Sequence, residues 1–350
     1  MRNSMKAFTA SDKRSIFFMV AMVALLMALG WGTFFAVVSP GNYAVGNHAV
    51  FGLGLAYTAF ALGIRHAFDA DHIAAIDNTT RKLVADGQRP FSVGFGFALG
   101  HSTVVILAVA LLAAGLNALA PQLIDSNSVL SSVAGAWGAL ISGGFLLLIG
   151  VLNLASLIGI CRMFRQPDTE TGSDARLEQQ LQNRGLLNRV LAPVARRVDK
   201  PWKMYPVGFL FGLGFDTATE ISLFVIGGSA ALTAPWYVVL VLPILFTAGM
   251  TLFDTLDGVL MNRVYEWAHA RPARRLYYNF TVTLLSITAA FLVGGIGLLG
   301  LLAQTLHSRS GVLAWVAGID LQNFGFVIVA IFLTTWLAAF AYWRWRRADL

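Results

Sequence analysis

The chain has 350 residues, of which 57% are hydrophobic and only 12% are charged, and its formal net charge is +7. Soluble domains contain about 25% charged residues, so this composition excludes an ordinary soluble protein and indicates a membrane protein. The single cysteine, Cys161, excludes both a disulfide framework and a thiolate metal cluster.

Apolar runs predict transmembrane helices along the whole chain. Eight such runs lie near residues 16–38, 49–76, 91–116, 131–160, 205–231, 235–261, 280–304 and 321–343. The first run has no obvious small-residue cleavage site, so we expect a retained helix rather than a signal peptide. We therefore predict an all-α, polytopic membrane protein with eight transmembrane helices, in which residues 1–350 form a single domain.

The basic residues predict the orientation of these helices. Of the 25 lysine and arginine residues, 23 lie at the two ends of the chain or in alternate connections between runs, all on one side of the membrane. By the positive-inside rule, both termini and the long polar segment 162–203, between spans four and five, are cytoplasmic. The net charge therefore reflects topology and contact with anionic lipid, and we expect no nucleic-acid partner.

The second run contains the sequence Arg-His-Ala-Phe-Asp-Ala-Asp-His at residues 65–72. Ionisable groups inside a bilayer are costly and usually mark a pathway or site, and imidazole together with carboxylate suits nickel, cobalt, zinc or iron. His66, Asp69 and His72 span an arc of about 120°, whereas Asp71 points nearly opposite Asp69. One ideal helix cannot aim all four at one ion, so we expect either an irregular helix or different roles. The segment predicts the core of a divalent-metal pathway.

Acidic residues lie inside or at the edge of the runs more often than basic ones. Seven of the eighteen acidic residues do so, whereas Arg65 is the only basic residue inside a run. We expect Asp77 to lie at a helix end near the lipid headgroups, where a charged side chain is tolerated. A position near the headgroups is not expected for Asp216, which lies deep in the fifth run. A bundle with this imbalance requires protons or a cation for compensation.

Further candidate ligands follow in later runs. The third run contributes His101, the fifth places Asp216 and Glu220 on one helix face, and the sixth does the same for Asp254 and Asp257. The complete set of predicted metal-pathway residues is His66, Asp69, Asp71, His72, His101, Asp216, Glu220, Asp254 and Asp257. We predict no catalytic residue and no cofactor-binding residue.

Two pairs of short segments suggest an internal repeat. Phe68-Asp69 resembles Phe215-Asp216, and Gly100-His101-Ser102 resembles Gly249-Met250-Thr251 at nearly the same offset. The related spans run in opposite directions through the membrane in the predicted topology. The pattern therefore indicates an inverted repeat, which is typical of transporters that bind their substrate between two halves.

Four motifs occur in order at residues 65–73, 99–105, 213–220 and 249–258. They read Arg-His-Ala-Phe-Asp-Ala-Asp-His-Ile, Leu-Gly-His-Ser-Thr-Val-Val, Leu-Gly-Phe-Asp-Thr-Ala-Thr-Glu and Gly-Met-Thr-Leu-Phe-Asp-Thr-Leu-Asp-Gly. With these motifs the whole chain resembles the nickel/cobalt transporter family of secondary permeases. The resemblance implies that His66, Asp71 and His72 carry the signature, supported by His101, Asp216, Glu220, Asp254 and Asp257.

The same resemblance implies uptake of Ni²⁺ or Co²⁺ across the cytoplasmic (inner) membrane without ATP hydrolysis. The ion would then be the substrate, and no cofactor is expected. One alternative is a related divalent metal exporter, but exporters often carry a histidine-rich loop and segment 162–203 contains no histidine. The other alternative is an intramembrane metalloenzyme, which typically needs more histidines than the six present here. The sequence leaves the choice between Ni²⁺ and Co²⁺ open.

Overall fold

The structure is a computed structural model that describes residues 8–45, 49–114, 128–164, 198–214, 218–269, 272–308, 310–319, 321 and 323–345. The first helix, α1 (Ala10–Thr33), continues through a π-helical turn (Phe34–Val38) into α2 (Ser39–Gly41). The strands β1 (Ala44–Val45) and β2 (Ala49–Val50) pair antiparallel.

The other elements are α3 (Leu53–Ala67), α4 (Ala70–Ala85), α5 (Val93–Ala113), α7 (Val129–Phe164), a 3-10 turn (Pro201–Lys203), α10 (Met204–Gly212), α11 (Ala218–Ala231), α12 (Trp236–Val239), α13 (Val241–His269), α14 (Pro272–Thr305), α15 (Gly311–Ala317) and α16 (Phe324–Trp345). The predicted all-α fold is confirmed, since β1 and β2 are the only strands in the described ranges. Most of the predicted loop 162–203 lies outside the described residues.

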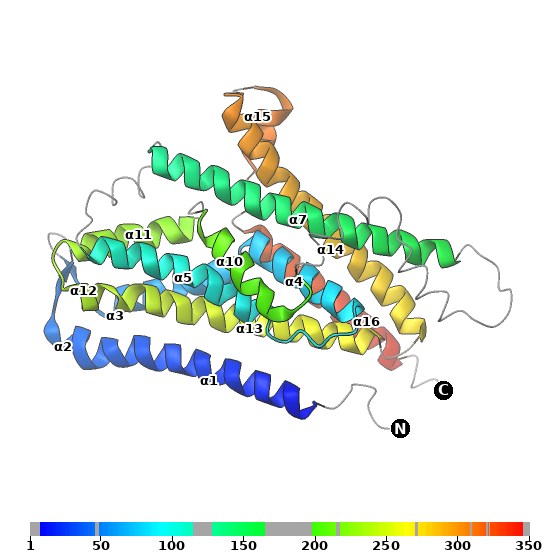
Figure 1. The fold of residues 1–350 in the computed structure, drawn as a ribbon, viewed down its shortest axis with the longest axis horizontal. Coiled ribbons are helices and arrows are strands. Elements are labelled where there is room, and N and C mark those ends of the chain that lie inside the picture. The colour runs from blue at the N-terminus through cyan, green and yellow to red at the C-terminus, as the bar shows by residue number, and fades with distance from the viewer. Residues whose placement is uncertain are drawn as a thin grey trace.

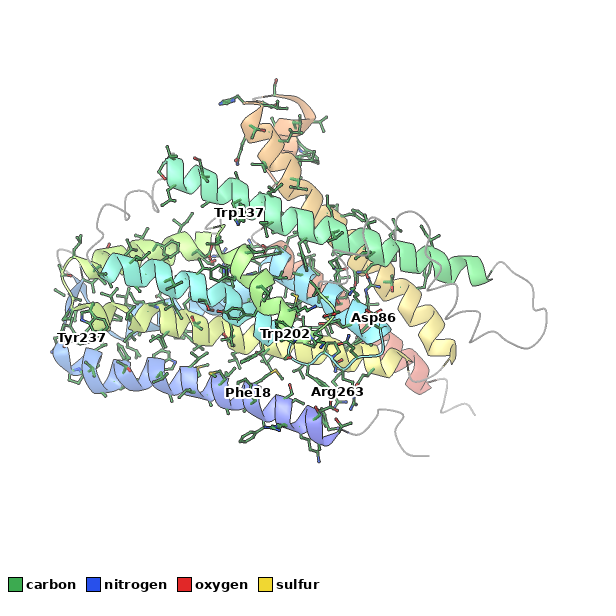
Figure 2. The ribbon with its side chains drawn as sticks, viewed as in Figure 1. Phe18, Asp86, Trp137, Trp202, Tyr237 and Arg263 are labelled. Atoms are coloured by element: carbon green, nitrogen blue, oxygen red, sulfur yellow. The ribbon has the colours of Figure 1, made fainter. Side chains whose placement is uncertain are left out.

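The composition of the helices is that of a membrane protein. Five segments of the described chain are long and apolar enough to cross a bilayer, namely Ala10–Gly41, Val93–Ala113, Val129–Leu154, Trp236–Glu266 and Thr283–Thr305. Shorter apolar helices cover Thr219–Ala231 and Phe324–Ala338. Large apolar side chains such as Phe18 on α1 and Trp137 on α7 are exposed on opposite sides of the bundle (Figure 2), as expected for surfaces that face lipid.

Two predicted spans are interrupted well inside the run. The run 49–76 contains α3 and α4, which are separated at Phe68 and Asp69. Asp69 is extended (φ −66°, ψ 144°), so it ends one helix and starts the next. The run 205–231 likewise contains α10 and α11, with residues 215–217 outside the described chain. Hydropathy alone does not locate these breaks, because the apolar composition is the same on both sides of each one.

The helices pack around a centre formed by α3–α4, α5, α10–α11 and α13 (Figure 1). On one side α1 lies along α13, and on the other side α7 packs across α14. The first residues of α1 and the last residues of α16 lie at the same end of the bundle (Figure 1).

Two helix crossings in this centre share one design. In both crossings, each helix has an aromatic residue three positions before a glycine, and each glycine lies against the backbone of the aromatic residue on the other helix. In the first crossing, Phe60 and Gly63 of α3 contact Phe246 and Gly249 of α13. In the second, Phe97 and Gly100 of α5 contact Tyr205 and Gly208 of α10. A Cβ atom at Gly63 would lie 2.0 Å from the Phe246 carbonyl oxygen, and one at Gly208 would lie 2.0 Å from the Phe97 carbonyl oxygen. Only glycine permits such close backbone contact, which is common between membrane helices.

A polar contact fixes α1 to the bundle at the end where α4 and α13 finish. Arg89, between α4 and α5, forms hydrogen-bonded ion pairs with Asp12 of α1 and with Glu266 of α13, the latter at 2.7 Å. The hydrogen bond to Glu266 raises the pKa of Arg89, so this arginine stays charged. The guanidinium of Arg263 adds a contact over the ring of Phe8, 3.5 Å from its centroid.

Candidate metal-binding site

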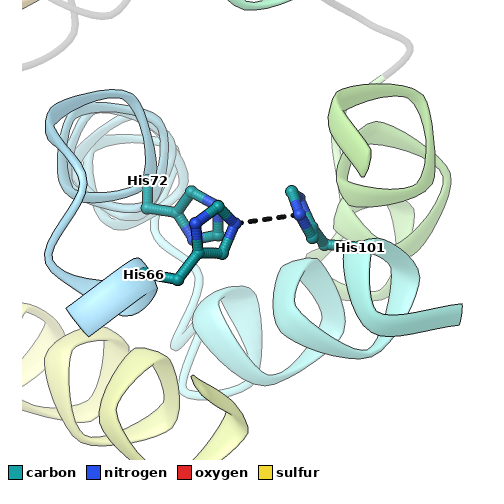
Figure 3. Close-up of side chains that lie close together, drawn as sticks. All are labelled: His66, His72 and His101. Carbon is teal, nitrogen blue, oxygen red and sulfur yellow. Dashed lines mark hydrogen bonds between the residues drawn. The ribbon is translucent and has the colours of Figure 1, made fainter. Parts of the chain in front are cut away.

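Three buried histidines meet at the centre of the bundle (Figure 3). His66 lies in the last turn of α3, His72 in the first turn of α4, and His101 on α5. Their ring centroids are 4.5 to 4.9 Å apart. One nitrogen from each ring lies within 4.8 Å of the other two, a spacing that could hold one metal ion.

The break between α3 and α4 produces this meeting. On an unbroken helix, side chains six residues apart point about 120° away from each other. The extended backbone of Asp69 instead turns the chain, so His66 and His72 approach to a centroid distance of 4.5 Å. The expectation of an irregular helix at this position is confirmed.

A carboxylate lies beside the Nδ1 atom of each of the first two histidines. His66 Nδ1 lies 2.8 Å from Asp69 Oδ2 and 2.9 Å from Thr219 Oγ1. His72 Nδ1 lies 3.2 Å from Asp254 Oδ2. In metal sites a histidine usually donates one ring N–H to a carboxylate, which orients the ring and leaves the other nitrogen for the metal. With Nδ1 as donor, Nε2 is the acceptor nitrogen of each ring.

The third histidine connects to the fifth predicted span. His101 Nε2 lies 2.7 Å from Glu220 Oε1 and 2.9 Å from His66 Nε2 (Figure 3). Two nitrogens bound to one ion at about 2.0–2.1 Å, at right angles, would also be about 2.9 Å apart. His72 Nε2 and His101 Nδ1 have no hydrogen-bond partner among the described residues. The cluster therefore combines imidazole nitrogens and a carboxylate oxygen that a divalent cation could bind.

Apolar side chains enclose the cluster. The ring of Phe97 packs edge-on against His72, with centroids 4.8 Å apart, and Phe246 lies 5.5 Å from His66. Met250, on the same helix as Asp254, is fully buried in this apolar surrounding. The low local dielectric strengthens the attraction between a cation and the surrounding carboxylates.

The structure brings six of the nine predicted residues together: His66, Asp69, His72, His101, Glu220 and Asp254. Asp71 is half-buried, and its Oδ1 accepts a hydrogen bond from the backbone N–H of His72. Asp257 lies one turn beyond Asp254 on α13, and Asp216 falls outside the described residues. The roles of these three remain predictions. Thr219 was not in the predicted set, although helix geometry places it on the same face as Asp216 and Glu220.

The sequence is similar to known proteins over most of its length. The chain matches the family described as high-affinity nickel-transport protein over residues 52–342. Nickel transporter NicT of Mycobacterium tuberculosis is 50% identical over 345 residues, which cover 98% of this chain and 92% of the relative. Nickel transporter NixA of Staphylococcus aureus is 41% identical over 94% of both chains. Cobalt transport protein NhlF of Rhodococcus rhodochrous is 36% identical over 95% of this chain and 93% of the relative. No solved structure matches this chain.

Proposed function

Because this chain belongs to the family of high-affinity nickel-transport proteins, we propose that it carries Ni²⁺ or Co²⁺ into the cell and binds the ion at the histidine cluster. It is a multi-pass membrane transporter and not an enzyme, and the metal ion is its substrate rather than a cofactor. The comparisons support neither the exporter nor the metalloenzyme alternative.

The binding site is supported by one observation: three buried imidazoles lie close together, and each lies beside a carboxylate. We assign His66, His72 and His101 as nitrogen ligands and Glu220 as an oxygen ligand. Asp69 and Asp254 hold two of the rings and add negative charge beside the ion. The carboxylates beside the imidazoles compensate a 2+ charge that would otherwise be costly inside a bilayer. Asp71, Asp216 and Asp257 are proposed positions along the path.

The membrane potential can supply the driving force for uptake. A cation gains about 2.3 kcal/mol per charge per 100 mV, so a divalent ion gains about 4.6 kcal/mol. This free energy corresponds to roughly 10³-fold accumulation. Uptake in this direction needs no ATP hydrolysis.

We propose eight spans arranged as an inverted repeat in the cytoplasmic membrane. In this arrangement α3–α4 and α10–α11 are two discontinuous spans related to each other, and α5 is related to α13. In each half, the discontinuous span crosses a helix of the other half: α3 crosses α13, and α10 crosses α5. Both crossings have the same spacing of aromatic residue and glycine, which supports the relation between the halves. Substrate sites at broken helices between two such halves are common in secondary transporters.

Epitope tags test this topology. Tags at residue 172 and at the C-terminus are expected on the cytoplasmic side, because both positions lie on the side predicted to hold 23 of the 25 lysine and arginine residues. A tag at residue 127 is expected on the opposite side. Protease access in oriented vesicles measures each position, and a cytoplasmic tag at 127 would contradict both the span count and the inverted repeat.

Competitive uptake tests the substrate. Cells that express the chain should accumulate radioactive nickel at submicromolar concentrations, and unlabelled cobalt should compete strongly. Zinc and manganese should compete poorly if the cluster disfavours the tetrahedral geometry of Zn²⁺ and the oxygen ligands preferred by Mn²⁺. Uptake no greater than in cells without the chain would refute the proposed function.

A further inference from the structure

The last helix contacts the break between α3 and α4. None of the predicted metal-pathway residues lies on α16, which runs alongside α4 (Figure 1). Gly325, in the first turn of α16, is buried against the backbone of Phe68 and Asp69. A Cβ atom at Gly325 would overlap the carbonyl oxygen of Phe68 and would lie 2.7 Å from its carbonyl carbon. Only glycine permits two backbones to approach this closely.

The residue after Gly325 adds a side-chain contact at the same place. The ring of Phe326 stacks on that of Phe68, with centroids 4.7 Å apart and an angle of 16° between the ring planes. Phe68 also contacts Phe253 of α13, at a centroid distance of 5.4 Å. Ile328 of α16 is buried in the same apolar cluster as the first turn of α4. The start of α16 therefore contacts the break through its backbone, through an aromatic ring and through an aliphatic side chain.

The break leaves the carbonyl group of Phe68 without a helical hydrogen bond. The next residue, Asp69, accepts a backbone hydrogen bond from Ile73 and so starts α4. In the described part of the chain, no backbone N–H donates to the Phe68 carbonyl, and Gly325 packs directly against it. Close Cα–H contacts to carbonyl oxygens recur where helices cross. Gly325 thus covers a polar group that would otherwise be exposed to the apolar interior of the bilayer.

Other helices fix the second half of α4. Tyr265 of α13 donates a hydrogen bond to Asp77, and Arg81 donates one to Thr283 of α14 at 3.0 Å. Asp77 was expected near the headgroups, but α4 continues for about two further turns and leaves this side chain fully buried. The first turn of α4, which carries His72, is held by α13 and by the start of α16.

We propose that Gly325 and Phe326 are positioning residues for the metal site, an inference that rests on the proposed binding of the ion at the histidine cluster. They hold the break in the geometry that turns His72 toward His66, at a centroid distance of 4.5 Å. Metal sites tolerate errors of only about 0.2 Å in the distance between ion and ligand. Movement of α16 away from the break therefore lowers the affinity for the ion, although α16 contributes none of the proposed ligands.

Equilibrium binding of Co²⁺ to purified variants tests this role. Gly325→Ala is expected to raise the Co²⁺ dissociation constant about 10–100-fold, the loss typical of groups that orient metal ligands. Phe326→Leu removes the stacked ring without adding atoms at the break, so it carries the test if Gly325→Ala does not fold. It should raise the constant about three- to tenfold, whereas Phe326→Tyr keeps the ring and should bind Co²⁺ as the wild type does. In proteoliposomes the half-saturating nickel concentration should rise by the same factors, with the maximal rate changed less than about threefold.

Gly143→Ala is the matched control, because Gly143 lies where α7 packs closely on α14, and a Cβ atom there would lie 2.7 Å from Leu298 Cγ. It should lower the melting temperature while the Co²⁺ affinity stays within about twofold of wild type. Val327→Ala, at an exposed position beside Phe326, should change neither quantity.

Three results would overturn the positioning role alone. The first is wild-type affinity in Gly325→Ala and Phe326→Leu. The second is a lower maximal rate at unchanged affinity, since α16 would then act on movement of the protein rather than on the site. The third is an equal loss of affinity in Gly143→Ala, because the loss would then follow from lower stability. A wild-type protein that binds no Co²⁺ would instead overturn the proposed binding site itself.

Discussion

Replacing His66 or His72 with alanine is expected to abolish high-affinity nickel uptake, with apparent affinity falling at least about a hundredfold. Residues that only orient a metal ligand typically contribute 10–100-fold in affinity, so loss of a ligand should cost more. The reason is geometric, because these rings and His101 supply all the imidazole nitrogens of the cluster. Radioactive nickel uptake at low concentration, together with equilibrium binding to the purified protein, measures both effects.

The controls for this experiment come from the same chain. His307→Ala removes an exposed histidine outside the cluster and should leave uptake unchanged. Asp69→Asn and Asp254→Asn retain the ring nitrogens but weaken their orientation, so their affinity should fall about 10–100-fold. Membrane levels of each variant must match the wild type for the comparison. Wild-type affinity in His66→Ala or His72→Ala would show that the ion does not bind at this cluster.

The sequence predicts which residues belong to the site better than it predicts which of them contact each other. The ionisable residues of the second run are conspicuous in an apolar helix, and helix geometry already shows that one straight helix cannot aim them at one ion. What the sequence does not reveal is how the conflict is resolved. Extended backbone at Asp69, a position with ordinary dihedral angles for any residue, turns His72 toward His66.

Pairings between distant helices are the least predictable part. His101 and Glu220 are separated by 119 residues, yet their side-chain atoms lie 2.7 Å apart. This contact depends on how α5 and α10–α11 cross, and the crossing depends on glycines whose role appears only when two backbones approach each other. Hydropathy predicts which segments are apolar helices, because every backbone polar group must be satisfied inside lipid. It contains no information about which helices touch.

Gly63→Ala is expected to have the second largest effect, on folding and uptake together. The added Cβ would lie 2.0 Å from the carbonyl oxygen of Phe246, so α3 and α13 must separate. Overpacking of this kind typically costs 1–3 kcal/mol and occasionally more. Because α3 carries His66 and α13 carries Asp254, separation also disturbs the cluster. We expect a lower melting temperature and a loss of at least about tenfold in uptake.

Gly54→Ala provides the control on the same helix, since a Cβ atom there would meet nothing within 4 Å. Its melting temperature should match or exceed that of the wild type, because alanine favours helix by about 1 kcal/mol over glycine. Gly208→Ala tests the related crossing of α5 and α10, where the Cβ would lie 2.0 Å from the Phe97 carbonyl oxygen. It should reproduce the losses of Gly63→Ala. If Gly63→Ala and Gly208→Ala behave like Gly54→Ala, the close crossings that position the histidines are not required for transport.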